Sequence, residues 1–151
     1  MEPRIRPFKI QDADEMLLLY NQYGVWFEDI GLTADFIISS AQRPDFTLQI
    51  AEQDNQLTGF AGSLYLEKVG RAELGPIAVK PEHQNKGVGG ILLDTVITEL
   101  KARNIRRIFV KVKASNLNAI SFFMSHGFGL EAYHRDYTMK HEDVVEMTLH
   151  V

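Results

Sequence analysis

The sequence predicts an α/β (α+β) fold in which about four helices flank one mixed, mostly antiparallel sheet of about six to seven strands. Segments with apolar residues at every second position alternate along the chain with segments whose apolar residues recur at helical spacing. Two of the strand-like segments are joined by one short turn, which is typical of an antiparallel hairpin. The 151 residues contain no repeat, low-complexity segment or linker, so we expect a single domain, residues 1–151.

The first third of the chain predicts an edge strand followed by two helices. Residues 3–8 are expected to form the strand, which a proline interrupts. From Asp12 onward apolar residues recur on one helical face, and Asp12 with Glu15 resembles a capping box. Thr33 is expected to cap a second helix over residues 34–41.

The middle of the chain predicts three strands in succession. Residues 46–52 alternate between apolar and polar side chains, and the polar turn 54–56 leads into a second strand, residues 57–66. A further turn at 68–70 precedes the third strand, residues 71–79. The first two of these strands are expected to pair as an antiparallel hairpin.

The remainder of the chain predicts a long helix, a buried strand, a short helix and two late strands. The long helix is indicated by Val88, Leu92, Val96 and Leu100, which repeat at intervals of four residues. Gly127 is expected to end the short helix. The expected ranges are residues 87–103, 105–112, 119–126, 128–134 and 144–150.

The composition excludes several kinds of chemistry. The chain has no cysteine, which excludes disulfides, cysteine-ligated metals and a catalytic thiol. With 16 basic and 20 acidic residues, the net charge of −4 argues against a nucleic-acid-binding protein. No metal-ligand spacing of His, Asp or Glu occurs, and no apolar stretch reaches the length of a membrane span. We therefore expect a cytoplasmic protein with no metal, nucleic-acid or membrane partner.

The stretch from Val79 to Gly90 predicts a site that binds an anion. A strand ends, a glycine-containing loop follows, and a helix begins with no Ser, Thr or Asp to cap it. The first N–H groups of that helix lack intrahelical partners, and the helix dipole favours negative charge there. Two known phosphate loops fit poorly: the Walker pattern needs Lys and then Ser/Thr, and the dinucleotide pattern needs a third glycine where Leu92 stands.

Two motifs in this part of the chain resemble signatures of the GNAT superfamily of N-acetyltransferases. The first is Q/R-x-x-G-x-G/A after a strand that ends in V-x-P, matched here by Val79, Pro81, Gln84, Gly87 and Gly89. The second, about 30 residues further on, is matched by Asn116, Ala119, Phe122, Phe123, Gly127 and Phe128. The predicted order of elements is similar to that of the family from about residue 4 to residue 150.

The resemblance implies an acyl-CoA-dependent N-acetyltransferase that uses acetyl-CoA as co-substrate. In the family, acetyl-CoA binds in an opening between the strands that correspond here to residues 71–79 and 105–112. The first strand pairs with the pantetheine arm, and the following loop binds the pyrophosphate. The cofactor-binding residues so implied are Ile77, Ala78, Val79, Gln84, Asn85, Lys86, Gly87, Val88, Gly89, Gly90, Asn116 and Phe123.

Direct transfer to an amine needs a group that removes a proton, because an alkylammonium has no lone pair. Glu73 stands where many family members have a base or a water relay, and Glu67 and Glu28 are weaker candidates. A bulge at Gly75-Pro76 is expected to aim one backbone N–H at the thioester oxygen. The structural alternative is that Glu73 is only the solvent-facing residue of an alternating strand.

One position departs from the family pattern. Many members have at residue 123 a tyrosine whose hydroxyl protonates the departing thiolate, whereas this chain has Phe123. Ser121, Tyr133, Tyr137 or a water molecule remain as replacements, and a thiolate leaves fairly well unaided. The departure also favours a second hypothesis, an acyl-CoA sensor without turnover.

Three further questions stay open in the sequence. The amine acceptor is unidentified, and a protein N-terminus, a lysine, a polyamine or a small metabolite all fit. The acyl group is also open, because a succinyl or propionyl group would suit the same motifs. Homodimers through the last strands are common in the family, and residues 144–150 are expected to leave a β-rich edge that supports one here.

Overall fold

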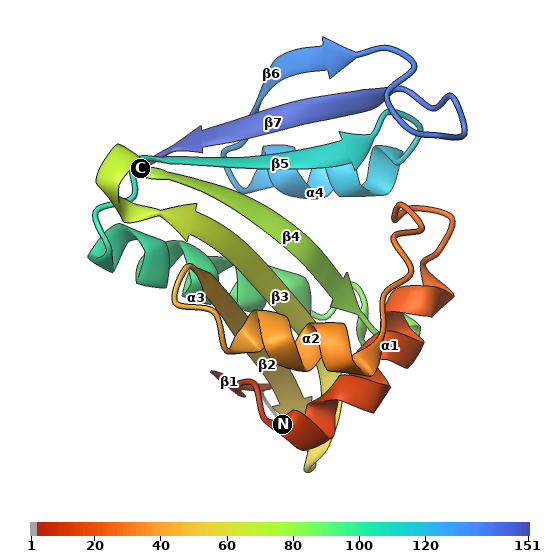
Figure 1. Cartoon of the computed structure of the whole chain (residues 1–151), viewed down its shortest axis with the longest axis vertical. Coiled ribbons are helices and arrows are strands. Elements are labelled where there is room, and N and C mark those ends of the chain that lie inside the picture. The colour runs from red at the N-terminus through yellow and green to blue at the C-terminus, as the bar shows by residue number, and fades with distance from the viewer. Residues whose placement is uncertain (1–2) are drawn as a thin grey trace.

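The computed structural model describes residues 3–151 and contains a seven-stranded sheet with four α-helices. The strands are arranged in the order β1-β2-β3-β4-β5-β7-β6, and every neighbouring pair is antiparallel except β4 and β5 (Figure 1). The fold class predicted from the sequence is confirmed. The strands are β1 Arg4–Pro7, β2 Phe46–Gln53, β3 Gln56–Leu66, β4 Arg71–Val79, β5 Arg107–Lys113, β6 Gly129–His134 and β7 Val144–His150. The helices are α1 Ala13–Gln22, α2 Ala34–Ala41, α3 Val88–Ala102 and α4 Leu117–Ser125.

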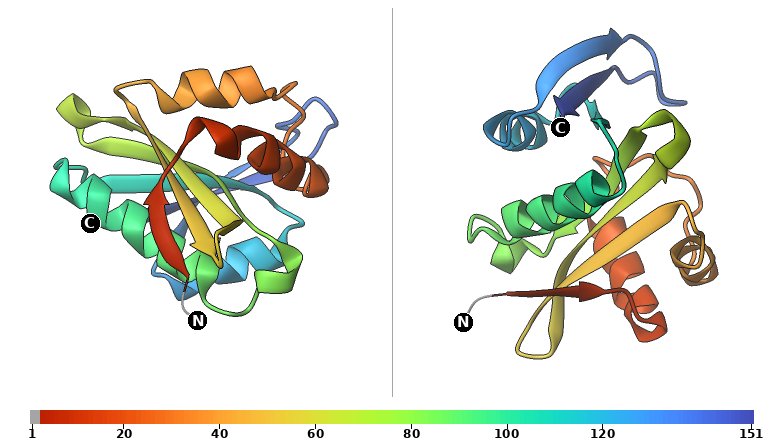
Figure 2. Two further views of the ribbon diagram at one scale, coloured as in Figure 1. Left: turned by 90° about the horizontal axis from the view of Figure 1, so that it is seen from below. Right: turned by 90° about the vertical axis from the view of Figure 1, so that its left-hand side faces the viewer.

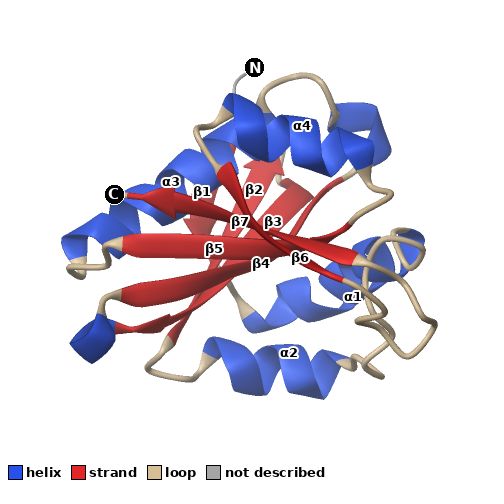
Figure 3. Ribbon diagram, turned by 90° about the horizontal axis from the view of Figure 1, so that it is seen from above, coloured by secondary structure: helices blue, strands red, loops and turns tan. Residues whose placement is uncertain are grey.

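The helices form two layers, one on each face of the sheet. Helices α1 and α2 lie on one face and α3 and α4 on the other (Figure 3), and the two further views in Figure 2 show the same separation. Each layer buries its own apolar cluster. Leu92, Val96 and Leu100 of α3 are fully buried against the sheet on one side, and Met16 and Leu19 of α1 are buried on the other.

The predicted element boundaries agree with the structure within two residues, and the two-residue differences have identifiable causes. The strand expected from Ile105 begins at Arg107, because the N–H of Ile105 still bonds to the Leu100 carbonyl at the end of α3. The short helix begins at Leu117, before its expected start, because the Asn116 side chain caps it by accepting a bond from the Ala119 N–H.

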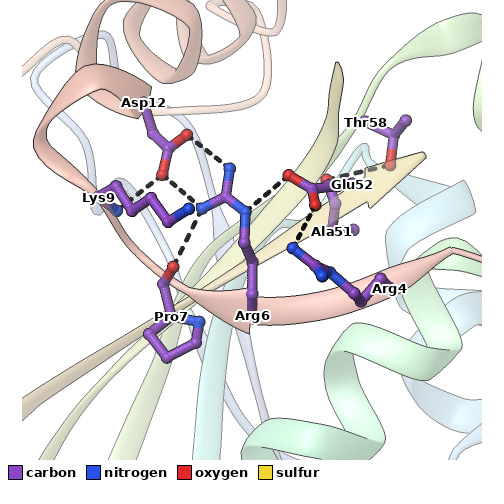
Figure 4. A network of polar contacts seen from close by, with 8 residues as sticks. All are labelled: Arg4, Arg6, Pro7, Lys9, Asp12, Ala51, Glu52 and Thr58. Carbon is purple, nitrogen blue, oxygen red and sulfur yellow. Dashed lines mark hydrogen bonds and ion pairs between the residues drawn. The ribbon is translucent and has the colours of Figure 1, made fainter. Parts of the chain in front are cut away.

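The capping box expected at Asp12 and Glu15 is wrong. The Asp12 side chain makes no bond to the first turn of α1, which follows a short 3₁₀ turn, Ile10–Asp12. Its carboxylate instead accepts two bonds from the Arg6 guanidinium, at 2.8 and 2.9 Å, and one from the Lys9 N–H (Figure 4). Local pattern identified the start of the helix, but a tertiary ion pair determined what the carboxylate does.

The expectation that residues 144–150 form the free edge of the sheet is also wrong. Strand β7 lies between β5 and β6, and it pairs with β5 over Val144–His150 and with β6 over Val144–Thr148. The edge on this side is β6, although it precedes β7 in the chain. A homodimer therefore stays a prediction, and the strand edge that would serve it is β6, where Leu130 and Tyr133 are exposed.

Two properties of the described residues bear on partners. None of the helices between residues 3 and 151 is long and apolar enough to cross a membrane. Within the same residues, no three His, Asp or Glu side chains lie close enough together to hold a metal ion.

Candidate active site

Strands β4 and β5 are paired over a short distance and then diverge, as Figure 1 shows. Their register covers only Arg71–Glu73 against Arg107–Phe109, so the rest of β4 has no partner on its β5 side. The N–H of Lys80 bonds to the Thr58 carbonyl of β3 at 2.8 Å. Because backbone groups of successive residues point to opposite sides of a strand, those of Ile77 and Val79 face the opening.

A bulge interrupts β4 at the start of this opening, as the sequence predicted. In the register between β3 and β4, Ala61 pairs with Ile77 and Ser63 with Leu74, so Gly75 and Pro76 stand opposite Gly62 alone. The space at Gly62 is restricted, since a Cβ there would lie 2.8 Å from Phe46 Cζ and 3.3 Å from the Gly75 carbonyl oxygen. Glycine at position 62 thus allows the two strands to approach while β4 bends.

The N-terminus of α3 lies beyond the end of β4 and has free backbone donors. Gly87 precedes the helix in the left-handed conformation, with φ of 85°, and no side chain caps the first turn. Within residues 3–151, no acceptor meets the N–H groups of residues 85–90. Gly89 also permits packing, because a Cβ there would lie 3.3 Å from the Phe122 ring of α4. The anion site expected from the sequence therefore has backbone donors that no acceptor among the described residues uses.

A contact that the sequence did not reveal joins α1 to this region. The Tyr23 hydroxyl donates to the Val79 carbonyl at 2.7 Å, and the Gln84 side-chain amide donates to the same hydroxyl. Burial raises the pKa of Tyr23, and the Glu82 carboxylate adds to that effect. The side chain of the motif residue Gln84 is thus held by α1, and no spacing in the sequence connects the two residues.

The other side of the opening is held in a similar way. The Lys113 ammonium of β5 donates to the Val25 carbonyl, just after α1, at 2.9 Å. The same ammonium lies 3.0 Å from Glu142, whose pKa is lowered mainly by this pair. The segment that follows α1 therefore contacts the ends of both diverging strands, β4 through Tyr23 and β5 through Lys113.

A cavity of about 270 Å³ lies beside the bulge, and three of the six residues considered for proton transfer line it. Glu73 and Glu28 both line it, together with Lys111 and Tyr137. Glu67 lies beyond the opposite end of β4, where its carboxylate pairs with Arg103 at 3.1 Å. Two of the three acidic residues considered for proton removal thus share one cavity, and Glu67 is apart from it.

Lys111 determines the electrostatics of this cavity. Its ammonium lies 3.8 Å from the Glu73 carboxylate and 5.7 Å from the centre of the Tyr137 ring. Burial opposes the charged form of Lys111, but Glu73 and the Tyr137 hydroxyl outweigh burial and raise its pKa. The cavity therefore holds a lysine that stays positively charged beside a half-exposed carboxylate.

The structure separates the three side chains considered as replacements for the missing tyrosine. Phe123 is only 2% exposed, and its ring packs edge-on against Phe122 and Phe128 in the core. Tyr133 points to solvent and donates to Asp143, and Ser121 is exposed on α4. Tyr137 alone among the three named candidates lines the cavity.

The two motifs and the fold agree with what is known of related proteins. The chain belongs to the acetyltransferase (GNAT) family, whose model matches residues 13–128. Over 99 residues it is 34% identical to the [ribosomal protein bS18]-alanine N-acetyltransferase of Salmonella typhimurium, and the match covers 64% of this chain and 66% of that protein. The match therefore spans slightly less than two thirds of that relative.

Solved structures support the same fold over nearly the whole chain. The ribosomal-protein-S18-alanine N-acetyltransferase of Escherichia coli superposes with a TM-score of 0.83 at 25% identity, covering 99% of this chain and 94% of that one. The protein yncA from Salmonella typhimurium, solved with its cofactor acetyl-CoA, has a TM-score of 0.87 at 20% identity and covers 99% and 94%. At that identity the second likeness concerns the fold alone.

Proposed function

We propose that this protein is an N-acetyltransferase that moves the acetyl group of acetyl-CoA directly to a primary amine. The observation that supports this best is a row of backbone groups along the opening that no neighbouring strand pairs, among which the Val79 carbonyl alone is bonded to a side-chain hydroxyl, that of Tyr23. This row runs from Ile77 and Val79 of β4 to the uncapped start of α3. An extended amide chain that ends in a pyrophosphate matches this set, because amides pair with a strand edge and phosphates with helix N-termini.

The cofactor contacts follow from the same geometry. Ile77 and Val79 pair through their backbone with the pantetheine arm, whereas the backbone of Ala78 faces β3, where it is in register with Phe60. The N–H groups of Asn85, Lys86, Gly87, Val88, Gly89 and Gly90 hold the pyrophosphate, whereas the N–H of Gln84 already bonds to the Pro81 carbonyl at 3.2 Å. The cap of α4 uses only Oδ1 of Asn116, which leaves its amide nitrogen to bond to pantetheine. Phe123 acts from the core by supporting the Phe122 ring that Gly89 contacts.

The reaction needs one proton acceptor and one proton donor. The amine nitrogen attacks the thioester carbon, the new C–N bond forms as the C–S bond breaks, and the thiolate receives a proton. Glu73, directly or through a water molecule, removes the proton from the amine, and the exposed carboxylate of Glu28 lies in the same cavity. Tyr137 protonates the thiolate, and a backbone N–H at the Gly75-Pro76 bulge stabilises the oxyanion.

The acceptor we propose is the α-amine of a protein or peptide. The relative from Salmonella typhimurium is named for the alanine of a ribosomal protein, which supports a polypeptide acceptor. It also supports a cytoplasmic location. Glu28 and Glu73 are the acceptors for the substrate amine in a cavity that Lys111 and Lys113 also line, and we propose that no metal takes part.

Calorimetry and turnover test the proposal in that order. Titration with acetyl-CoA is expected to show binding, and absence of binding at high micromolar concentration contradicts the proposal. Release of free thiol is then followed with a panel of peptides, lysine derivatives and polyamines. Binding without release on any amine supports the alternative that Phe123 raises, a sensor of acyl-CoA without turnover. Parallel assays with propionyl-CoA and succinyl-CoA determine the acyl group.

A further inference from the structure

A second cavity, of about 250 Å³, lies on the other side of the bulge, between α2 and the sheet. Its walls come from α1, α2, β2 and β3, and Pro76 of the bulge completes them. The proposed reaction uses none of these walls. The side chains that shape the cavity are Met16, Phe36, Ile37, Leu48 and Phe60.

The lining determines what kind of group fits. Among the described residues that surround the cavity, Ser40 and Tyr20 are the only ones with polar side-chain atoms. The Tyr20 hydroxyl is already bonded to the Glu28 carbonyl at 3.0 Å. No charged side chain lines the cavity, so an ion or a strongly polar group would lose its hydration without compensation. The occupant must therefore be apolar.

The cavity directly adjoins the polar cavity that holds Glu73 and Glu28. Tyr20 lines both, and Gly75 of one is the chain neighbour of Pro76 of the other. Consecutive Cα atoms are at most about 3.8 Å apart, so at the bulge the two linings approach each other to within one peptide unit. A ligand with its ammonium among the carboxylates needs only a short link to place an apolar group here.

The size and the position of the cavity favour an apolar group of the amine acceptor as its occupant. An apolar cavity of about 150 Å³ is known to accommodate benzene, so 250 Å³ holds a leucine, methionine or phenylalanine side chain. The rim is formed by Ile30 and Phe36, which are 62% and 57% exposed, so the cavity is open on the face covered by α1 and α2. That face is opposite α3, whose N-terminus is the proposed pyrophosphate site.

We propose that this cavity binds the apolar group of the acceptor. The preferred substrate is then a primary amine with a large apolar group two or three carbons from its nitrogen, such as a peptide that begins with Leu, Met or Phe. The inference rests on the proposed acetyl transfer for the position of the amine, and it narrows the acceptor beyond a generic polypeptide α-amine.

Occupancy is tested first without any turnover. The protein is labelled with ¹³C in its methionine methyl groups and titrated, in the presence of CoA, with 2-phenylethylamine and with ethylamine. Both probes have the same charge and only one has a ring. The Met16 methyl signal is expected to shift to saturation with 2-phenylethylamine only. Met124 and Met139, which are 55% and 94% exposed, serve as internal controls.

Two variants on neighbouring positions of α2 connect occupancy to specificity. Ser40→Phe fills the cavity, whereas Ser39→Phe adds the same side chain on the exposed face of α2. In wild type, kcat/KM for a peptide that begins with Leu is expected to exceed that for the same peptide beginning with Gly by about 10- to 100-fold. Ser40→Phe is expected to remove this preference, and Ser39→Phe is expected to keep it.

The outcomes separate this inference from the proposed function. A shift of Met16 without thiol release on any amine supports the cavity assignment and contradicts acetyl transfer. Thiol release without a Met16 shift, or without a preference for the Leu peptide, overturns the cavity assignment alone. A Met16 shift with hexanoyl-CoA but not with acetyl-CoA also overturns it, because the occupant is then the acyl chain.

Discussion

Two clusters of charged side chains differ in how completely they are partnered. In the first, shown in Figure 4, Arg6 donates to Asp12 and Glu52 at 2.7 to 2.9 Å, and the three side chains are 7 to 13% exposed. In the second, beside the bulge, Lys111 is 3.8 Å from Glu73 and the two side chains are 30% and 41% exposed. The first joins β1, β2 and the start of α1, whereas the second faces a cavity.

The difference indicates which cluster maintains the fold and which has groups free to react. A partly buried guanidinium between two carboxylates restricts all three groups, because each loses hydration that its hydrogen-bond partners replace. A carboxylate with one loose partner and access to water retains lone pairs that can accept a proton from a substrate. We therefore expect substitutions in the first cluster to change stability and those in the second to change activity.

The largest effect is expected for Glu73→Gln. Loss of the proton acceptor should lower kcat/KM by about 100- to 1,000-fold while calorimetric binding of acetyl-CoA is retained. Glu67→Gln is the matched control, because it lies beyond the other end of β4 and outside the cavity. Equal activity of Glu73→Gln and wild type would show that Glu73 is only a surface residue, and Glu28→Gln would then be examined.

The next largest effect is a loss of stability, which we expect for Arg6→Met. The Asp12 carboxylate, 7% exposed, would lose the partner that compensates its burial, and we expect the free energy of unfolding to fall by about 2–4 kcal/mol. Urea denaturation measures this change. Arg43→Met breaks a pair with Asp45 that is exposed to solvent, and its midpoint should stay close to that of wild type. Similar losses in the two variants would contradict the distinction between the clusters.

A smaller effect is expected for Tyr137→Phe. A thiolate leaves with little help, so loss of the proton donor should lower kcat by only about tenfold, with KM for acetyl-CoA unchanged. Tyr133→Phe is the control, because its hydroxyl bonds to Asp143 outside the cavity. If the two variants have the same kcat, the proton reaches the thiolate by another route.

The smallest expected effect is on the pH dependence of stability. Burial favours the neutral form of Asp12, but the Arg6 guanidinium and the Lys9 N–H outweigh burial and lower its pKa. A carboxyl whose pKa is lower when folded stabilises the protein above its unfolded pKa, near 3.9, and loses this contribution as pH falls through the folded value. Urea midpoints of wild type and Arg6→Met should therefore converge as pH falls below about 4. A constant difference would assign the loss to packing.

Local patterns in the sequence were sufficient to predict the helices and strands. They were least able to predict the contacts of side chains whose partners are distant in the chain. Thr33 caps α2 as expected, by accepting a bond from the Phe36 N–H, because a cap involves neighbours in the chain. Asp12 follows the same kind of pattern, yet its carboxylate bonds to Arg6 of β1 instead. No local rule separates these two cases, since the competing partner enters only when β1 packs beside α1.

The same distinction between local and distant contacts applies to the candidate site. The uncapped glycine loop before α3 was predictable, because glycines and missing caps act within one turn of helix. The bond from Tyr23 to Val79 and the sharing of one cavity by Glu73, Glu28 and Tyr137 were not, because these residues come from segments far apart in the chain. The structure was likewise needed to show that Glu67 and Tyr133 lie outside this cavity.

By itself the sequence determined the alternation of helices and strands, the bulge at Gly75-Pro76 and the uncapped start of α3 after Gly87, all of which depend on residues within a few positions of one another. Only the tertiary structure decided that β7 separates β5 from β6, that the α1 end contacts both diverging strands, and that an apolar cavity adjoins the carboxylates. Those features depend on packing between the layers. The hydrophobic pattern of the sequence is compatible with several pairings of elements, and complementary shape and burial determine which pairing forms.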